Sequence, residues 1–295
     1  MSGELFSVGR GSPPEKTGAS AEFKLSITRA LADQLADSLG KLHHAPLTEK
    51  NLNALQARPG VYELFLPNDS GEFKRVYVGK ASKDLPSRLW NHLRKLSGRS
   101  NISLSDVRFQ CLYVDEDLEA AAPEKMLIKR YRGEGGVPWN TNGFGNKDPG
   151  RNRDRSLVKV NHFDAEYPVN LDLEIEFTAP APRTLQRYLE AVKANLPFNF
   201  RYDKSVSAKK AYSAAIVELP KRATAAELIR RALDALPDGW QVTALPGYVI
   251  LYQEEETYDS ARIIWRKQGR LVQRFEGPNR RDDAGEVEET DRDEE

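Results

Sequence analysis

The chain has 295 residues, of which 39% are hydrophobic and 30% are charged. This length suits one large or two ordinary domains, and the apolar fraction can form a packed core. No apolar run approaches the ~20 residues that a membrane-spanning helix needs, so we expect no membrane contact. Cys111 is the only cysteine, which excludes an internal disulfide and a thiolate metal cage. The first residues lack the pattern of a signal peptide, so we expect a cytoplasmic protein.

The formal net charge of zero conceals a polarised chain. Residues 58–156 carry 18 Lys and Arg against 13 Asp and Glu, whereas residues 276–295 carry 3 against 10. Between Lys74 and Arg99 there are eight basic residues and a single acidic one, Asp84. Contacts with phosphates require such a basic surface, so this part of the chain is a candidate for DNA binding. A solvated helix face is the alternative interpretation.

The N-terminal part is predicted to be a disordered segment followed by helices. Residues 1–21 are rich in Gly, Ser and Pro, a composition typical of disorder. Apolar residues recur at nearly helical spacing over residues 23–42, and Thr48 is a candidate N-cap of a second, short helix. We therefore assign residues 22–57 to a helical arm.

A small mixed α/β domain is predicted over residues 58–156. Two apolar segments, 61–66 and 73–78, flank a turn that contains Asn, Asp and Gly, which is typical of a hairpin. Pro86 suits the first turn of a helix that runs to about residue 96, and residues 107–114 are predicted to form a third strand. Pro123 opens a further helix that ends near residue 131.

The second half is predicted to be an accessory α+β domain, over residues 165–275. Helical periodicity over 183–196 and a Thr224–Glu227 capping box alternate with strand-like segments at 198–202, 214–219 and 261–265, and a hairpin is expected about Pro246 and Gly247. This part holds no catalytic grouping, so we expect it to bind a partner or DNA, or to stabilise an oligomer. Residues 276–295 are acidic and are predicted to be a disordered tail.

Three polar residues of the first domain have the chemistry that phosphodiester hydrolysis requires. Arg88 and His92 stand four residues apart on one helix face, where a guanidinium can bind phosphate. The imidazole can hydrogen-bond a tyrosine hydroxyl or the phosphate, or move a proton near neutral pH. Glu124 offers the hard oxygen ligand that Mg²⁺ prefers. The alternatives are a surface pair and a favourable helix-dipole position. The buried stripe of the same helix is expected to exclude Arg88 and His92 and to consist of Leu85, Leu89, Leu93 and Leu96.

A loop rich in Gly and Arg follows at residues 142–155. Glycine lets the backbone approach a duplex closely, and arginine can read guanine edges in the major groove. DNA contact is therefore the functional interpretation, and a basic linker between domains is the alternative. The candidate DNA-binding residues of the domain are Lys83, Arg94, Lys95, Asn146, Lys147, Arg151, Arg153 and Arg155.

The order of these motifs resembles the GIY-YIG nuclease family. Gly60-Val61-Tyr62 and Tyr77-Val78-Gly79 are similar to its two tripeptides, and Arg88, His92, Glu124 and Asn140 follow in the family's order. Residues 143–151 resemble a loop of the Eco29kI-type restriction endonucleases within that family. The resemblance covers roughly residues 22–155, about half of the chain.

The resemblance also implies a role for each residue. Tyr62 would be the general base for water, Tyr77 would hydrogen-bond in the same site, and Asn140 would brace it. A free phenol has a pKa near ~10, so Tyr62 needs a cationic neighbour, for which Lys80 is the obvious candidate. Glu124 would hold one Mg²⁺ or Mn²⁺ ion per active site. The predicted catalytic set is Tyr62, Tyr77, Lys80, Arg88, His92, Glu124 and Asn140.

These features together predict a metal-dependent endonuclease of double-stranded DNA. The expected form is a type II restriction enzyme, and restriction-type members cut both strands of a palindrome as two-fold homodimers. One alternative is an anti-phage or repair nuclease in which residues 165–275 select the substrate or a protein partner. Another is a non-catalytic DNA-binding protein on a degenerate nuclease fold, against which the intact motif residues count.

Overall fold

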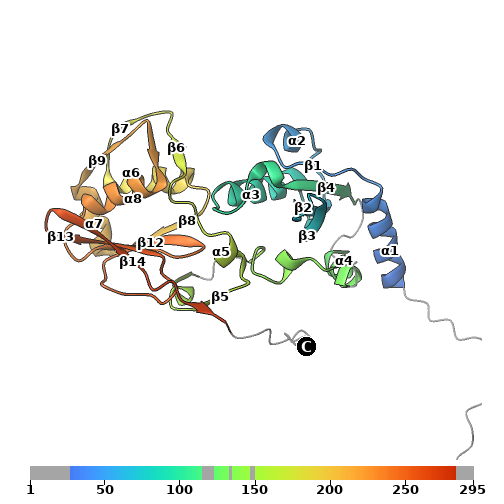
Figure 1. Ribbon diagram of the computed structural model, residues 1–295. Helices are drawn as coiled ribbons and strands as arrows, with labels where there is room; N and C mark the ends of the chain where they lie inside the picture. Colours follow the sequence, from blue (N-terminus) through green and yellow to red (C-terminus); the bar gives the residue numbers. More distant parts are fainter. Residues whose placement is uncertain (1–26, 115–122, 133–134, 147–149, 284–295) are drawn as a thin grey trace, which may run out of the picture.

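A computed structural model describes residues 27–114, 123–132, 135–146 and 150–283. These residues form two α+β domains that lie side by side, with α5 (Phe163–Glu166) and β5 (Val158–Lys159) between them (Figure 1). The predicted disordered N-terminal segment, residues 1–21, lies outside the described residues. No helix among those described is both long enough and apolar enough to cross a membrane.

The first domain is built on a four-stranded antiparallel sheet with the strand order β1-β4-β2-β3. The central strand β2 is buried along most of its length, because β3 and β4 cover both of its edges. The predicted hairpin and third strand are confirmed, whereas the short edge strand was not foreseen because two residues carry no periodicity. The strands are β1 (Ala45–Pro46), β2 (Gly60–Pro67), β3 (Phe73–Ala81) and β4 (Arg108–Tyr113).

Helix α3 (Leu85–Ser97) lies against the hairpin and begins at Asp84, whose carboxylate accepts a hydrogen bond from the backbone N–H of Ser87. The predicted leucine stripe is buried, as expected. The same face also buries His92, so the prediction that this residue lies off the buried stripe is wrong. The leucine spacing defines where the stripe is centred but not how wide it is, and His92 lies one residue before Leu93, at its margin.

The helical arm packs onto the first domain. Helix α2 (Glu49–Asn53) is capped by Thr48 as predicted, and α1 (Ile27–Gly40) lies along α4 (Pro123–Tyr131) (Figure 1). An ion pair joins Arg130 Nε to Asp33 Oδ1 at 2.7 Å. The buried side chains that the two helices share with the sheet are Leu35, Leu39, Leu127, Tyr131, Val61 and Val78.

The accessory domain contains a five-stranded sheet with the order β14-β13-β11-β12-β8, in which only β8 and β12 run parallel. Large apolar and aromatic side chains from the sheet and from its helices form one core. The predicted hairpin about Pro246 and Gly247 is confirmed as β11 and β12. The strands are β8 (Asn199–Tyr202), β11 (Gln241–Ala244), β12 (Tyr248–Tyr252), β13 (Ile263–Gln268) and β14 (Leu271–Glu276).

Three helices accompany this sheet. Helix α8 (Ala225–Asp234) has the predicted capping box, in which the Thr224 and Glu227 side chains bond each other's backbone N–H groups. Helix α6 (Leu185–Asn195) matches the predicted periodicity, whereas α7 (Val206–Ala214) was not predicted. Two further strand pairs complete the domain: β6 (Glu174–Glu176) with β10 (Arg222–Thr224), and β7 (Ala181–Thr184) with β9 (Ile216–Leu219).

The first part of the predicted disordered tail, residues 276–295, is in fact structured. Glu276 ends β14, and β15 (Arg281–Asp282) pairs in parallel with β5. The backbone N–H of Asn279 donates to the Ala261 carbonyl at 2.8 Å. Acidic composition indicates solvation of side chains but does not reveal these backbone hydrogen bonds. Residues 284–295 lie outside the described part.

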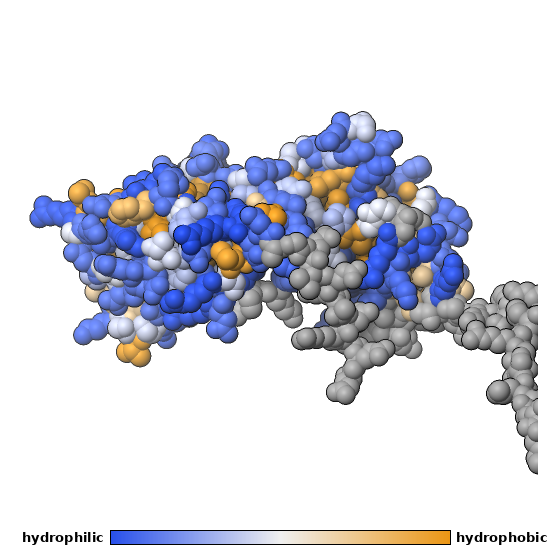
Figure 2. Space-filling view, turned by 60° about the horizontal axis from the view of Figure 1, so that its bottom comes forward, coloured by the Kyte–Doolittle hydropathy of each residue, from blue (hydrophilic) through white to orange (hydrophobic). Residues whose placement is uncertain are grey.

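The surface of the two domains is largely hydrophilic. Figure 2 shows one face, on which polar residues cover most of both domains and apolar residues form small separate groups. This face therefore presents small apolar groups within a largely polar surface.

Candidate active site

The hairpin brings the two tyrosines of the tripeptides together. Tyr62 on β2 lies opposite Gly79 on β3, and its ring centroid is 6.1 Å from that of Tyr77. A Cβ atom at position 79 would lie 2.3 Å from the Tyr62 hydroxyl oxygen. Glycine is therefore required here, because any larger residue would displace the phenol. Both tyrosines are buried.

Helix α3 supplies two partners for the Tyr62 hydroxyl. The Nε2 atom of His92 lies 2.6 Å from this oxygen, and Nε of Arg88 donates a hydrogen bond to it at 3.2 Å. The spacing of four residues places both side chains on the same helix face, as the sequence predicts. Two groups from α3 thus converge on one phenolic oxygen of β2.

His92 is neutral in this environment. Burial, with the nearby cations Arg88 and Lys95, lowers the pKa of His92 from 6.5 to about 3. The predicted hydrogen bond of His92 to a tyrosine hydroxyl is present, whereas its low pKa disfavours the charged imidazole near neutral pH. A neutral imidazole has one nitrogen that accepts a hydrogen bond, and in the Nδ1–H tautomer Nε2 can accept the Tyr62 proton.

The depressed pKa of His92 makes the stability of the fold sensitive to acid. Between pH 3 and 6.5 the unfolded chain binds a proton at this histidine that the folded protein excludes, so stability is fully present above pH 6.5 and falls as the pH drops toward 3. Protonation of this histidine should lower the free energy of unfolding by about 2 kcal/mol between pH 7 and pH 5. In urea unfolding, the free energy of unfolding should therefore fall by about 2 kcal/mol less in His92→Gln than in the wild type over this pH range. Equal losses in both proteins would contradict this assignment.

The ionisation of Tyr62 is opposed by its surroundings. Burial, together with Tyr77, raises the pKa of Tyr62 well above 10, and Arg88 acts in the opposite direction. The cation that hydrogen-bonds to Tyr62 is thus Arg88, whereas the sequence suggested Lys80. The charge of Lys80 instead acts on Glu124, where it opposes the rise in the pKa of the carboxyl that burial causes. A stable phenolate is disfavoured, so proton transfer from Tyr62 needs an acceptor.

Glu124 lies at the start of α4, close to the same site. It is half-buried, and its charge raises the pKa of both Tyr62 and Tyr77. Burial raises the pKa of Glu124 itself, opposed by Lys80 and Arg88. Among the described residues its carboxylate has no hydrogen bond or ion pair, so its oxygens remain available to a ligand.

A divalent cation such as Mg²⁺ fits this donor set. No cluster of three or more His, Cys, Asp or Glu side chains that could enclose a metal occurs in the described part of the chain. Mg²⁺ is commonly held by one or two carboxylates and retains several water ligands, so a single half-buried carboxylate suits it. Zn²⁺ sites, in contrast, usually have three or four protein ligands.

The side chain of Asn140 connects the loop after α4 to the hairpin through hydrogen bonds. Asn140 ends the 3-10 helix Pro138–Asn140, and its side-chain amide forms two hydrogen bonds with the backbone of Val78. Oδ1 accepts from the N–H at 2.9 Å and Nδ2 donates to the carbonyl at 2.8 Å. Because Val78 stands between Tyr77 and Gly79, this pair of bonds holds both in register.

The loop contributes a residue that the sequence analysis missed. Phe144 is buried, stacks on His92 at 4.9 Å and meets Tyr77 edge-on at 5.0 Å. The next residue, Gly145, lies so close that a Cβ there would be 3.0 Å from the Tyr77 hydroxyl. Phe144 therefore packs against both rings. The sequence signal that could have indicated Phe144 is its position between two glycines, Gly143 and Gly145.

Several predicted DNA-binding residues have protein partners instead of an open surface. Arg94 donates to the Leu196 carbonyl of the accessory domain at 2.9 Å, and Lys95 donates to the Phe144 carbonyl. Arg153 pairs with Asp164 at 2.8 Å, and Arg155 with Glu256 at 3.2 Å. Arg94 and Arg155 therefore help to join the two domains, which for Arg155 is close to the linker interpretation of the loop.

The remaining candidates are at or near the surface. Lys83 and Asn146 are exposed, and Arg151 lies over the ring of Tyr252 at 4.1 Å. Lys147 lies outside the described residues. DNA binding by these residues stays a prediction.

A comparison with protein families identifies the first domain. The family model described as the Eco29kI GIY-YIG domain matches residues 67–164, about a third of the chain. The match contains Tyr77, Arg88, His92, Glu124 and Asn140, and Tyr62 precedes it on the strand paired with β3. A search of curated proteins found no match. The chain therefore contains a GIY-YIG nuclease domain of the Eco29kI type.

Proposed function

We propose that this protein is a Mg²⁺- or Mn²⁺-dependent endonuclease of double-stranded DNA and that it acts as a restriction enzyme. The observation that carries the proposal is the convergence on Tyr62: a neutral imidazole and a guanidinium meet its hydroxyl, and a half-buried carboxylate acts on its pKa. These groups come from β2, α3 and α4. They supply a base, a phosphate-binding cation and a metal ligand, which phosphodiester hydrolysis requires.

The Tyr62–His92 pair offers a route for the proton of the attacking water. Arg88 donates to the Tyr62 oxygen, so the phenol can direct its own proton to Nε2 of His92. As the phenolic oxygen takes a proton from water, it can pass its own to the imidazole, and no free phenolate has to accumulate. The positive charge of Arg88 favours the transient negative charge on oxygen.

Arg88 and Glu124 serve the phosphate. The guanidinium can form additional hydrogen bonds to phosphoryl oxygens, where negative charge builds in the transition state. Glu124 would hold the metal ion, which on binding supplies a Lewis acid for the phosphate. Tyr77 is buried beside the guanidinium, but the imidazole of His92 is hydrogen-bonded to Tyr62, so we assign Tyr77 a hydrogen-bonding role and not that of a base.

The restriction role and the partners rest on the family. The matched family is named after a restriction endonuclease, and a palindromic site is matched by a two-fold homodimer. The accessory domain is joined to the nuclease domain through Arg94 and Arg155. We therefore assign it a part in placing the duplex, with the exposed Lys83 and Asn146 as contacts on the nuclease side.

Removal of one hydroxyl tests this proposal. Tyr62→Phe retains the ring that packs in the hairpin and deletes only the oxygen on which His92 and Arg88 converge. The single-turnover rate of duplex cleavage with Mg²⁺ should fall at least ~100-fold, the lower end of general-base contributions. Tyr77→Phe, the matched control, should cost less, because its hydroxyl only orients neighbours.

Binding of DNA separates chemistry from folding in this experiment. Both phenylalanine variants should bind the duplex as the wild type does and unfold at similar temperatures. If Tyr62→Phe cleaves at the wild-type rate, another group is the base, and His92 is the next candidate.

A further inference from the structure

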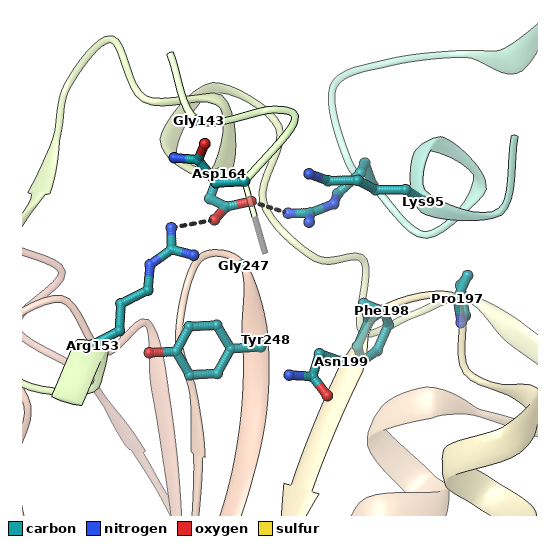
Figure 3. A pocket seen from close by; sticks show the side chains of 11 residues that line it. Lys95, Gly143, Arg153, Asp164, Pro197, Phe198, Asn199, Gly247 and Tyr248 are labelled. Carbon is teal, nitrogen blue, oxygen red and sulfur yellow. Dashed lines mark hydrogen bonds and ion pairs between the residues drawn. The ribbon is translucent and has the colours of Figure 1, made fainter. Parts of the chain in front are cut away.

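A pocket of about 210 Å³ lies between the two domains. Figure 3 shows that Lys95, Arg153 and Asp164 line it from the nuclease side and that Asn199 and Tyr248 line it from the accessory side. Neither domain alone encloses it. The pocket is distinct from the site around Tyr62.

Positive charge exceeds negative charge around this pocket. Asp164 forms ion pairs with Arg99 Nη1 and Arg153 Nη2, each at 2.8 Å, and Lys95 is a third cation beside it. His162 adds no negative charge to the pocket. Burial lowers its pKa, which favours the neutral imidazole. Three cations thus face one carboxylate. Buried charge is unfavourable unless it is paired, so an additional anion would stabilise this arrangement.

Arg99 also has an unused donor. Its side chain is 4% exposed, and its Nε atom is buried without a hydrogen-bond partner among the described residues. A guanidinium that is buried in a protein normally has its N–H groups satisfied, because an unpaired buried donor loses its bonds to water without replacement. Arg99 lines the pocket, and its incompletely hydrogen-bonded guanidinium adds to the positive charge of the pocket wall.

We propose that the pocket between the domains binds a phosphate group. Phosphate is an anion whose several oxygens match arginine donors arranged around one point. The pocket is smaller than the ~300–1,000 Å³ of typical small-molecule sites, which fits a single group better than a whole nucleotide. The phosphate is either free or part of a DNA backbone; only the second source rests on the proposed function.

The position of Lys95 gives the bound phosphate a connection to the catalytic residues. Its Nζ atom donates to the Phe144 carbonyl and lies 4.7 Å from the centre of that ring. The same ring stacks on His92, the partner of Tyr62. A phosphate at Lys95 would therefore be bound directly behind the loop that covers the catalytic tyrosines, and it would connect the second domain with the first.

Calorimetric titration of the full chain with inorganic phosphate tests the site. The wild type should bind phosphate with a Kd in the millimolar range or tighter, at constant ionic strength. Arg153→Gln and, in a second variant, Lys95→Met should each weaken binding at least 10-fold. The matched control is Arg222→Gln, which removes an exposed arginine paired with Glu174 and should bind as the wild type does.

A second arm distinguishes the two sources of the phosphate. Fluorescence anisotropy without divalent metal would measure affinity for a DNA duplex. If the pocket holds a backbone phosphate, Arg153→Gln weakens duplex binding and inorganic phosphate competes with the duplex. If the pocket holds free phosphate, neither the Arg153→Gln substitution nor added inorganic phosphate changes the affinity for the duplex.

The proposal is overturned if wild-type protein shows no phosphate binding at tens of millimolar and Arg153→Gln binds duplex as the wild type does. It is also overturned if both variants bind phosphate as tightly as the wild type. Absence of cleavage together with intact phosphate binding would count against the proposed nuclease function alone.

Discussion

Replacement of Glu124 by alanine is expected to abolish cleavage while duplex affinity stays within a few-fold of the wild type. The charge of this half-buried carboxylate acts on both Tyr62 and Tyr77 and raises the pKa of each. Its loss removes the proposed metal ligand, and metal ions contribute several kcal/mol of charge stabilisation in such reactions. The basic residues that we propose as phosphate contacts are unchanged. Single-turnover cleavage and duplex binding, measured on the same preparation, check both parts.

A matched variant shows whether the effect is specific to the site. Glu72 is an exposed carboxylate on the same domain, paired with Lys74, and Glu72→Ala should cleave at the wild-type rate. If Glu124→Ala retains Mg²⁺-dependent cleavage, this residue does not hold the metal. If it loses DNA binding as well as cleavage, the carboxylate has a structural role.

Replacement of Arg88 by alanine is expected to slow cleavage by about 10²–10³-fold. Loss of one preorganised charge contact at a transition state costs roughly 3–4 kcal/mol. Arg88→Ala also removes the donor to the Tyr62 hydroxyl and a cation that lowers the pKa of Tyr62, so the base and the phosphate contact weaken together. The rate should be measured with saturating enzyme, so that weaker binding does not contribute.

The lysine variant separates charge from geometry. Arg88→Lys retains the charge but lacks the planar fork, and an ammonium cannot donate to Tyr62 and bind a phosphate in the same way. It should therefore rescue poorly. Arg274→Lys, at an exposed pair with Glu276, is the control and should have no effect. A near-normal rate for Arg88→Ala would place this residue outside the catalytic site.

The parts of the fold that could be predicted are those determined by local signals. The hairpin follows from two apolar segments around a turn, and the N-terminus of α8 from its capping box. The order of Tyr62, Tyr77, Arg88, His92, Glu124 and Asn140 was visible from the resemblance to the GIY-YIG family. The meeting of Arg88 and His92 at the Tyr62 hydroxyl depends on how α3 packs against the hairpin.

The parts that could not be predicted depend on contacts between distant segments. A count of basic residues does not distinguish Lys83, which faces solvent, from Arg153, which pairs with Asp164. The burial of His92 depends on Phe144, which is more than fifty residues away in the chain. The strand near residue 281 depends on a partner at residue 158. Sequence periodicity reports one face of one element and carries no information about such partners.

Cleavage of unmodified phage DNA by the purified wild-type protein tests the central claim most directly. The ends of the products should be mapped after incubation with Mg²⁺, and a parallel reaction should contain a chelator in excess of the metal. We predict double-strand breaks at a defined sequence, giving discrete fragments, and no breaks when the metal is chelated. Intact DNA after prolonged incubation of folded, DNA-binding protein with Mg²⁺ or Mn²⁺, or equal cleavage in the presence of the chelator, would contradict the account.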